Sequence, residues 1–183
     1  MAEVTQLLGA AGQGDRAALD QLFALLYDEL RRLGRSRLSR SAHMTLLDPT
    51  SLVHECYMRF LNMRRLEVTD RGQFLAYAAR VMRFVVVDFV RQREADRRGG
   101  DRIQVTLNTG IAESVASVPD DVIRVNELLE VLAQSDERVV QIVEMRCFAG
   151  MSEVEIAEAL GITDRTVRRD WQKARALIAA SLQ

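Results

Sequence analysis

The chain ends in two short segments that each carry the start signals of a helix, with one glycine between them. Ser152 can cap the first segment, and Glu155 three residues later completes the pattern of a capping box. Gly161 can adopt the left-handed conformation that ends a helix. Thr163 can cap the second segment, eleven residues after the first cap. The sequence therefore predicts a helix, a tight turn and a second helix over residues 151–175.

The second of these helices has two distinct faces. Its apolar stripe, at helical spacing, consists of Val167, Trp171, Ala174 and Ile178. The opposite face carries Arg165, Arg169 and Gln172, flanked by Arg168 and Lys173. Between residues 163 and 183 the basic residues outnumber the acids five to two. Asp170 lies at the edge of the apolar face, where it can pair with an arginine.

A helix-turn-helix with a basic second helix is typical of proteins that read duplex DNA. The first half of such a helix faces the base edges, so Arg165, Arg168 and Arg169 are the candidate base readers, because arginine contacts guanine or phosphate with two hydrogen bonds. The other candidate DNA contacts on this helix are Thr166, Gln172, Lys173 and Arg175, of which Lys173 and Arg175 are expected to touch phosphate. The alternative is a solvated charged face on an ordinary surface helix, but caps, turn and charge together favour DNA.

Composition limits the class of protein. The 183 residues are 48% apolar and 28% charged, which suits one or two small globular domains. No stretch is apolar enough to span a membrane and no signal peptide is recognised, so a cytoplasmic location is expected. Cys56 and Cys147 are unpatterned, and His43 and His54 lack metal-ligand spacing. The sequence thus predicts neither a metal site nor a cofactor.

Charge is unevenly distributed along the chain. Residues 1–98 carry 16 arginines and 12 acids, whereas residues 99–183 carry 9 basic and 14 acidic residues. The second half is acidic except for its final helix. Such local basic charge suits a protein that depends on a larger partner for its affinity for DNA.

Helical periodicity dominates the rest of the chain and predicts an all-α fold. One long helix is expected over residues 15–40, a second opens at Asp48-Pro49, and a third covers roughly residues 73–98. Gly99-Gly100 should end the third helix, and residues 99–120 have the composition of a flexible linker. Helices resume near 121–133 and 136–148. The sequence therefore predicts two helical domains, residues 1–98 and 121–183, the second of which contains the helix-turn-helix.

Three motifs in this order resemble the bacterial extracytoplasmic-function (ECF) sigma factors. They are Leu52-Val-His-Glu-Cys-Tyr-Met-Arg-Phe60, then Phe74-Leu-Ala-Tyr77 with Arg80 and Asp88, and finally the segment Met151–Arg175. The last is similar to the family pattern S-x-x-E-I-A-x-x-L-G-I-x-x-x-T-V-x-x-x-x-x-x-A-R. The resemblance covers nearly the whole chain and implies the second and fourth domains of larger sigma factors.

The resemblance implies an alternative sigma factor, not an enzyme, that binds RNA polymerase core and directs promoter-specific initiation of transcription. The first domain would bind the polymerase clamp, and the residues implied for this contact are Asp48, Thr50, Ser51, Glu55 and Arg59. The loop near residues 67–73 and the basic helix after it would bind the separated downstream strand. The residues implied there are Tyr77, Arg80, Phe84 and Arg91, with the two aromatic rings as candidates for base stacking. The last helix would read the upstream element as duplex.

The chain departs from the family pattern at the start of the clamp-binding helix. Relatives show an acidic cluster there, whereas this sequence has Asp48-Pro49-Thr50-Ser51. Loss of charge-assisted bonds would weaken polymerase binding, and a phosphate on Thr50, or secondly Ser51, would restore the charge. A Ser/Thr kinase is therefore a candidate activator, and an anti-sigma protein is another candidate regulator. The alternatives are that both hydroxyls only support the helix cap, or that other contacts compensate.

A second departure is Phe84, where many relatives carry Asn. The family pattern therefore does not specify the contacts to the separated DNA strand at this position. A phenylalanine here fits a half-buried position on the helix.

Two other functional classes compete with a sigma factor. A one-component helix-turn-helix regulator outside the polymerase would need a ligand or dimer domain in residues 1–98, and no sensor pattern occurs there. An enzyme would need a catalytic site, and no phosphate loop, metal cluster or nucleophile triad is recognised. His54, Glu55 and Cys56 are adjacent, but neighbours on a helix point in different directions.

Overall fold

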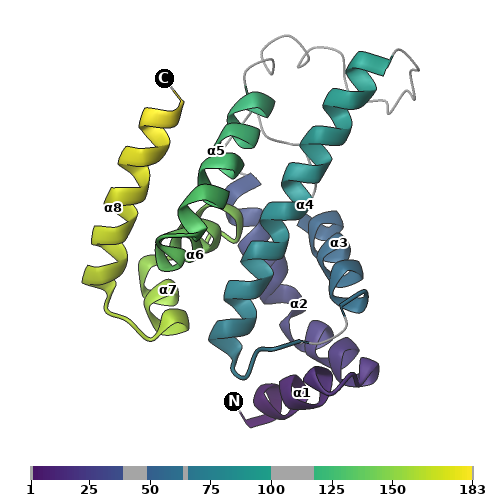
Figure 1. Cartoon of the computed structure of the whole chain (residues 1–183). Coiled ribbons are helices and arrows are strands. Elements are labelled where there is room, and N and C mark those ends of the chain that lie inside the picture. The colour runs from purple at the N-terminus through teal and green to yellow at the C-terminus, as the bar shows by residue number, and fades with distance from the viewer. Residues whose placement is uncertain (1, 39–48, 64–65, 100–117, 183) are drawn as a thin grey trace.

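The computed structural model describes residues 2–38, 49–63, 66–99 and 118–182. Every regular element in these ranges is helical, as the all-α prediction requires (Figure 1). The helices of the first half are α1 (Ala2–Gly12), α2 (Arg16–Leu38), α3 (Pro49–Leu61) and α4 (Arg71–Gly99). Those of the second half are α5 (Val118–Ala133), α6 (Glu137–Val143), a π-helical turn η1 (Glu144–Phe148), α7 (Glu153–Leu160) and α8 (Asp164–Ser181).

The long helix α4 lies at the centre of the molecule (Figure 1). Helix α3 packs on one side of it, and α5, η1 and α7 pack on the other. Helix α8 forms the outer layer, where it packs on α5, α6 and α7. The N-terminal part of α3 and the outward-facing side of α8 therefore lie on opposite sides of α4.

Aromatic rings hold the first half together. Phe74 of α4 is fully buried, and its ring packs at 5.8 Å from Phe23 of α2 and 5.4 Å from Phe60 of α3, measured between centroids. The apolar residues at helical spacing on α2, α3 and α4 are buried, and they include Leu19, Leu22, Phe23, Leu26, Leu30, Leu52, Val53, Cys56, Phe60, Phe74, Ala78, Val81 and Val85. Burial raises the pKa of Cys56 to about 12, so its thiol is a neutral core group.

Helix α1 was not expected from the sequence. It packs on α2 through Val4, Leu8 and Ala11, which are buried and recur at helical spacing. Gly12 lies close to the loop that precedes α4. A Cβ on Gly12 would stand 2.9 Å from the Leu66 carbonyl oxygen. Three apolar positions among small residues are a weak pattern, which explains why the helix was missed.

Several helix boundaries differ from those expected. Helix α4 begins at Arg71, because the Asp70 carboxylate caps the helix by accepting a hydrogen bond from the Gln73 backbone N–H. From the sequence, Asp70 was expected to lie inside the preceding loop. Helix α5 begins at Val118, so the last three residues of the expected linker are helical. The expected helix at 136–148 starts at its Asp136 cap but changes to a π-helical turn at Glu144. Asp48 and residues 100–117 lie outside the described residues.

The two halves share one hydrophobic cluster. Ile142, Met145 and Ile156 of the second half are fully buried among the side chains of α2 and α4. A smaller cluster around Leu129, Val139 and Val143 joins α5, α6 and α8. The division into domains at 1–98 and 121–183 stays a prediction, but in this structure the predicted domains are packed together.

Candidate nucleic-acid and polymerase-binding surfaces

The N-terminal caps of α7 and α8, and the turn between these helices, have the predicted geometry. Ser152 and Glu155 form the reciprocal capping box at the start of α7. Gly161 ends α7 in the left-handed conformation at φ 64°. Thr163 caps α8 by accepting a hydrogen bond from the Thr166 backbone N–H at 3.2 Å. These three local predictions are confirmed, and together they fix the direction in which α8 leaves α7.

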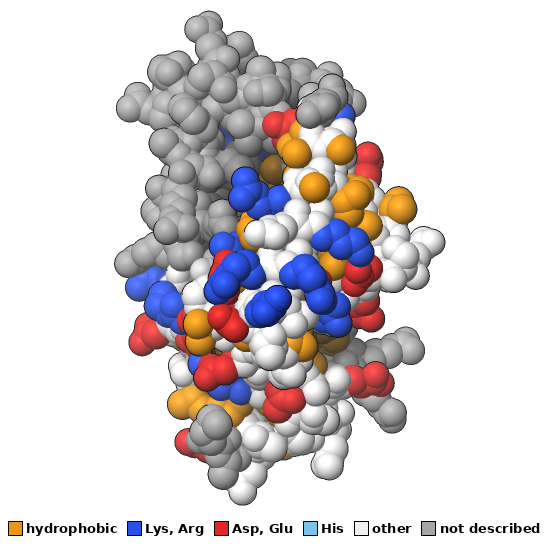
Figure 2. All heavy atoms as spheres, turned by 90° about the vertical axis from the view of Figure 1, so that its left-hand side faces the viewer, with side chains coloured by type: hydrophobic (Ala, Val, Ile, Leu, Met, Phe, Trp, Pro, Cys, Tyr) orange, Lys and Arg blue, Asp and Glu red, His pale blue; other side chains and the backbone are white. Residues whose placement is uncertain are grey.

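The apolar stripe of α8 attaches that helix to the rest of the molecule. Val167 and Ala174 are fully buried, and Trp171 and Ile178 pack against the two clusters. The Arg146 guanidinium lies 4.8 Å from the Trp171 ring centroid. The opposite face is exposed, as predicted. Basic side chains gather on it (Figure 2), and the exposed candidates on this helix are Arg165, Arg168, Arg169, Gln172, Lys173 and Arg175.

Acidic residues hold several of these basic side chains in place. Arg168 donates to Glu153 of α7 at 3.1 Å and to Asp164 at 3.2 Å, and the hydrogen bond from Arg168 to Glu153 lowers the pKa of Glu153. Lys173 donates to Asp136 at 2.7 Å and lowers its pKa, so α8 is also tied to the cap of α6. Arg168 is thus held by two carboxylates, which any other partner of these two N–H groups would have to replace.

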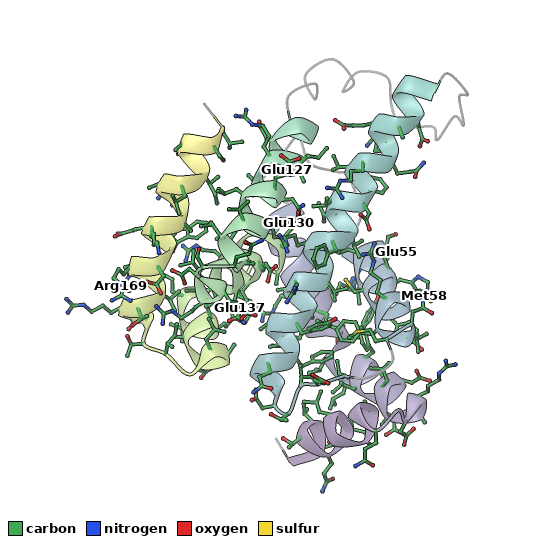
Figure 3. All side chains as sticks on the ribbon, viewed as in Figure 1. Glu55, Met58, Glu127, Glu130, Glu137 and Arg169 are labelled. Atoms are coloured by element: carbon green, nitrogen blue, oxygen red, sulfur yellow. The ribbon has the colours of Figure 1, made fainter. Side chains whose placement is uncertain are left out.

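Asp170 pairs with arginines, as expected from its place at the edge of the apolar face. Its carboxylate is nearly buried and lies 2.8 Å from Arg138 of α6 and 3.0 Å from Arg169. Arg169 is still largely exposed, and its side chain extends outward from α8 (Figure 3). Asp170 therefore accepts a hydrogen bond from the Arg169 guanidinium at Nε, while most of that side chain stays exposed.

The candidate strand-binding residues of α4 do not all lie together. Tyr77 and Arg80 line a cleft of about 770 Å³ between α4 and the second half. The Tyr77 hydroxyl lies 3.2 Å from the Met63 sulfur, and its ring packs edge-on against Phe60, so Tyr77 is partly a core residue. Phe84 is half-buried, as predicted, under the Arg83 guanidinium at 4.6 Å. Arg91 is exposed further along the helix.

The candidate polymerase-binding residues lie on α3. Pro49 is the first residue of this helix, as predicted, and Thr50, Ser51 and Glu55 are exposed. Arg59 donates to Asp88 of α4 at 2.6 Å, so this candidate holds α3 against α4. Asp48 lies outside the described residues.

Two further residues near these surfaces were not selected from the sequence, one exposed and one buried. Met58 is 42% exposed and projects from α3 near Glu55 (Figure 3). Its position three residues after Glu55 on a helix was an available signal. Arg83 is almost fully buried in an ion pair with Glu144 of η1. Its partner lies far along the chain, so periodicity gave no sign of it.

The described residues hold no group of three His, Cys, Asp or Glu side chains that could bind a metal ion. None of the described helices combines the length and apolar character needed to cross a membrane.

Comparison with known protein families gives one match over the full length. The sequence model of the family described as "ECF sigma factor" matches residues 1–183. No curated protein matches the chain.

Proposed function

Since the chain belongs to the ECF sigma factor family, we propose that it binds RNA polymerase core and directs the polymerase to specific promoters. Residues 1–98 act as sigma domain two and residues 121–183 as sigma domain four. The observation that carries the proposal is the exposed basic face of α8, on a helix whose start and direction are fixed by the Thr163 cap and the Gly161 turn. A rigidly presented row of arginines suits the major groove.

In this proposal Arg165, Arg168 and Arg169 read bases of the upstream element, and Thr166 and Gln172 support them. Lys173 and Arg175 contact phosphates at the far end of the helix. The segment Asp48–Arg59 contacts the polymerase clamp, with Glu55 as an exposed acid on α3. Tyr77, Arg80, Phe84 and Arg91 bind the separated downstream strand.

We further propose that phosphorylation of Thr50, or secondly Ser51, by a Ser/Thr kinase activates polymerase binding. Both residues are exposed and lie in the first turn of α3, where the helix dipole stabilises an added negative charge. An anti-sigma protein is a separate candidate partner that would act by covering these surfaces.

Replacing Arg169 tests the assignment of α8. Arg169→Ala should weaken binding to the cognate promoter duplex by about 1–3 kcal/mol and relax its sequence preference, because a bidentate base contact is lost. The measurement is fluorescence anisotropy with cognate and scrambled duplexes at fixed salt.

Arg175→Ala is the matched control on the same helix. It should weaken binding to both duplexes equally and reduce the salt dependence, as loss of a phosphate contact does. An equal loss on both duplexes for Arg169→Ala would show that Arg169 contacts phosphate and does not read a base.

A further inference from the structure

Glu153, the first residue of α7, connects the face of α8 to a second arginine. Its Oε1 accepts a hydrogen bond from Arg146 at 3.1 Å, and its Oε2 accepts one from Arg168 Nε at 3.1 Å. The Arg146 guanidinium in turn lies 4.8 Å from the centroid of the Trp171 ring. The hydrogen bonds from Arg168 and Arg146 lower the pKa of Glu153, so the carboxylate is charged at neutral pH. Both of its oxygens are thus engaged before any partner arrives.

The Arg168 guanidinium is held along one edge. Its Nε donates to Glu153, and its Nη2 donates to Asp164, one turn earlier in α8. A guanidinium has five N–H donors, so within the described part of the chain three of them remain for an outside acceptor. The side chain is 56% exposed, and the remaining donors belong to Nη1 and Nη2, the fork that matches N7 and O6 of guanine. Arg168 therefore keeps donors for a base while both carboxylates stay bound.

An arginine that is fixed in advance favours a base over a phosphate. A mobile arginine loses rotamer freedom when it binds and can turn toward any phosphate within its reach. Arg168 has already lost much of this freedom, because Glu153 and Asp164 hold two of its nitrogens. The two carboxylates also place negative charge beside the guanidinium, which opposes the approach of phosphates. The arrangement suits contact with one base and disfavours binding that ignores sequence.

We propose that Glu153 is a positioning residue for DNA recognition, which holds Arg168 so that the remaining fork of its guanidinium reads a guanine in the duplex. The inference rests on the proposed function, in which Arg168 is one of three base readers on α8. It adds a residue of α7, outside the recognition helix, to those that determine promoter preference.

Glu153→Gln tests the proposal, because it removes the charge and keeps the size of the side chain. The N-terminal cap of α7 is kept, since it consists of Ser152 and Glu155. Glu158→Gln is the matched control, because it removes the same charge from an exposed residue of the same helix that lines the cleft toward α4. Circular dichroism checks that each variant is folded.

The probe is a duplex that the full-length wild-type chain selects from a randomised library, and a scrambled duplex of the same composition is the reference. Fluorescence anisotropy gives the ratio of the two dissociation constants. Glu153→Gln should lower this discrimination about fivefold, by weakening binding to the selected duplex and strengthening binding to the scrambled one, whereas Glu158→Gln should keep the wild-type ratio. In an Arg168→Ala background, Glu153→Gln should cause no further loss of discrimination, because the side chain that it positions is gone.

A wild-type ratio in Glu153→Gln, an equal loss in Glu158→Gln, or an equally large loss in the Arg168→Ala background would overturn the role of Glu153. If Arg168→Ala weakens binding to both duplexes equally, Arg168 contacts phosphate, and the inference fails while the proposed function stands. If the wild-type chain selects no sequence from the library, the reading of duplex DNA by α8 is itself wrong, and the inference fails with it.

Discussion

Phosphorylation of Thr50 is expected to strengthen binding to RNA polymerase core by at least about tenfold. A phosphate adds about −1.5 to −2 charges and three strong acceptor oxygens. Each charge-assisted bond regained at the clamp contributes about 1.5–3 kcal/mol, and about 1.4 kcal/mol corresponds to tenfold in affinity. The exposed position of Thr50 in the first turn of α3 leaves it accessible to a kinase. Biolayer interferometry with immobilised core enzyme measures the change.

Substitutions at the same position separate charge from cap support. Thr50→Ala should abolish the response to kinase treatment, unless Ser51 is the modified residue, in which case Ser51→Ala abolishes it. Thr5→Glu adds a charge at an exposed threonine of α1 and should leave polymerase affinity unchanged. Tight binding by the unmodified protein that neither kinase treatment nor these α3 substitutions alter would refute the switch.

Phe74→Ala should lower the free energy of unfolding by about 3–5 kcal/mol, which is a large part of the about 5–15 kcal/mol typical of folded proteins. Phe74 is fully buried and its ring joins α4 to Phe23 of α2 and Phe60 of α3. Removing it leaves a cavity where three helices meet. Urea denaturation followed by circular dichroism measures the loss.

Phe89→Ala is the matched control on the same helix. Phe89 is only half-buried, and the Arg93 guanidinium lies 5.9 Å from its ring centroid. Its removal should therefore cost clearly less than the removal of Phe74. Equal losses for the two variants, or a loss below about 1 kcal/mol for Phe74→Ala, would show that the three-ring contact does not hold the first half together.

Local signals in the sequence predicted local structure well. The Ser152 capping box, the left-handed Gly161 and the Thr163 cap each involve residues within a few positions of one another, so their chemistry is legible without the fold. The apolar and basic faces of α8 followed from helical spacing for the same reason. Helix α1 escaped prediction because its buried face has only three strong positions, Val4, Leu8 and Ala11.

Contacts between distant segments could not be predicted in this way. Nothing near Arg83 in the sequence indicates that Glu144 is its partner, and nothing near Gly72 indicates Ala159. Both contacts depend on how the two halves pack, which periodicity does not encode. The family resemblance implied Tyr77 and Arg80 as candidates for strand binding, but it did not indicate that they share a cleft with carboxylates of the second half.

The most direct test of the proposed function is transcription from purified components. The wild-type chain, unmodified and kinase-treated, is mixed with RNA polymerase core and genomic promoter fragments, and the 5′ ends of the transcripts are mapped. We expect transcripts from discrete start sites that disappear when the chain is omitted and weaken with Arg169→Ala. Core enzyme that gives the same transcripts with and without the chain, in both modification states, would contradict the proposal that this protein is a promoter-specificity subunit.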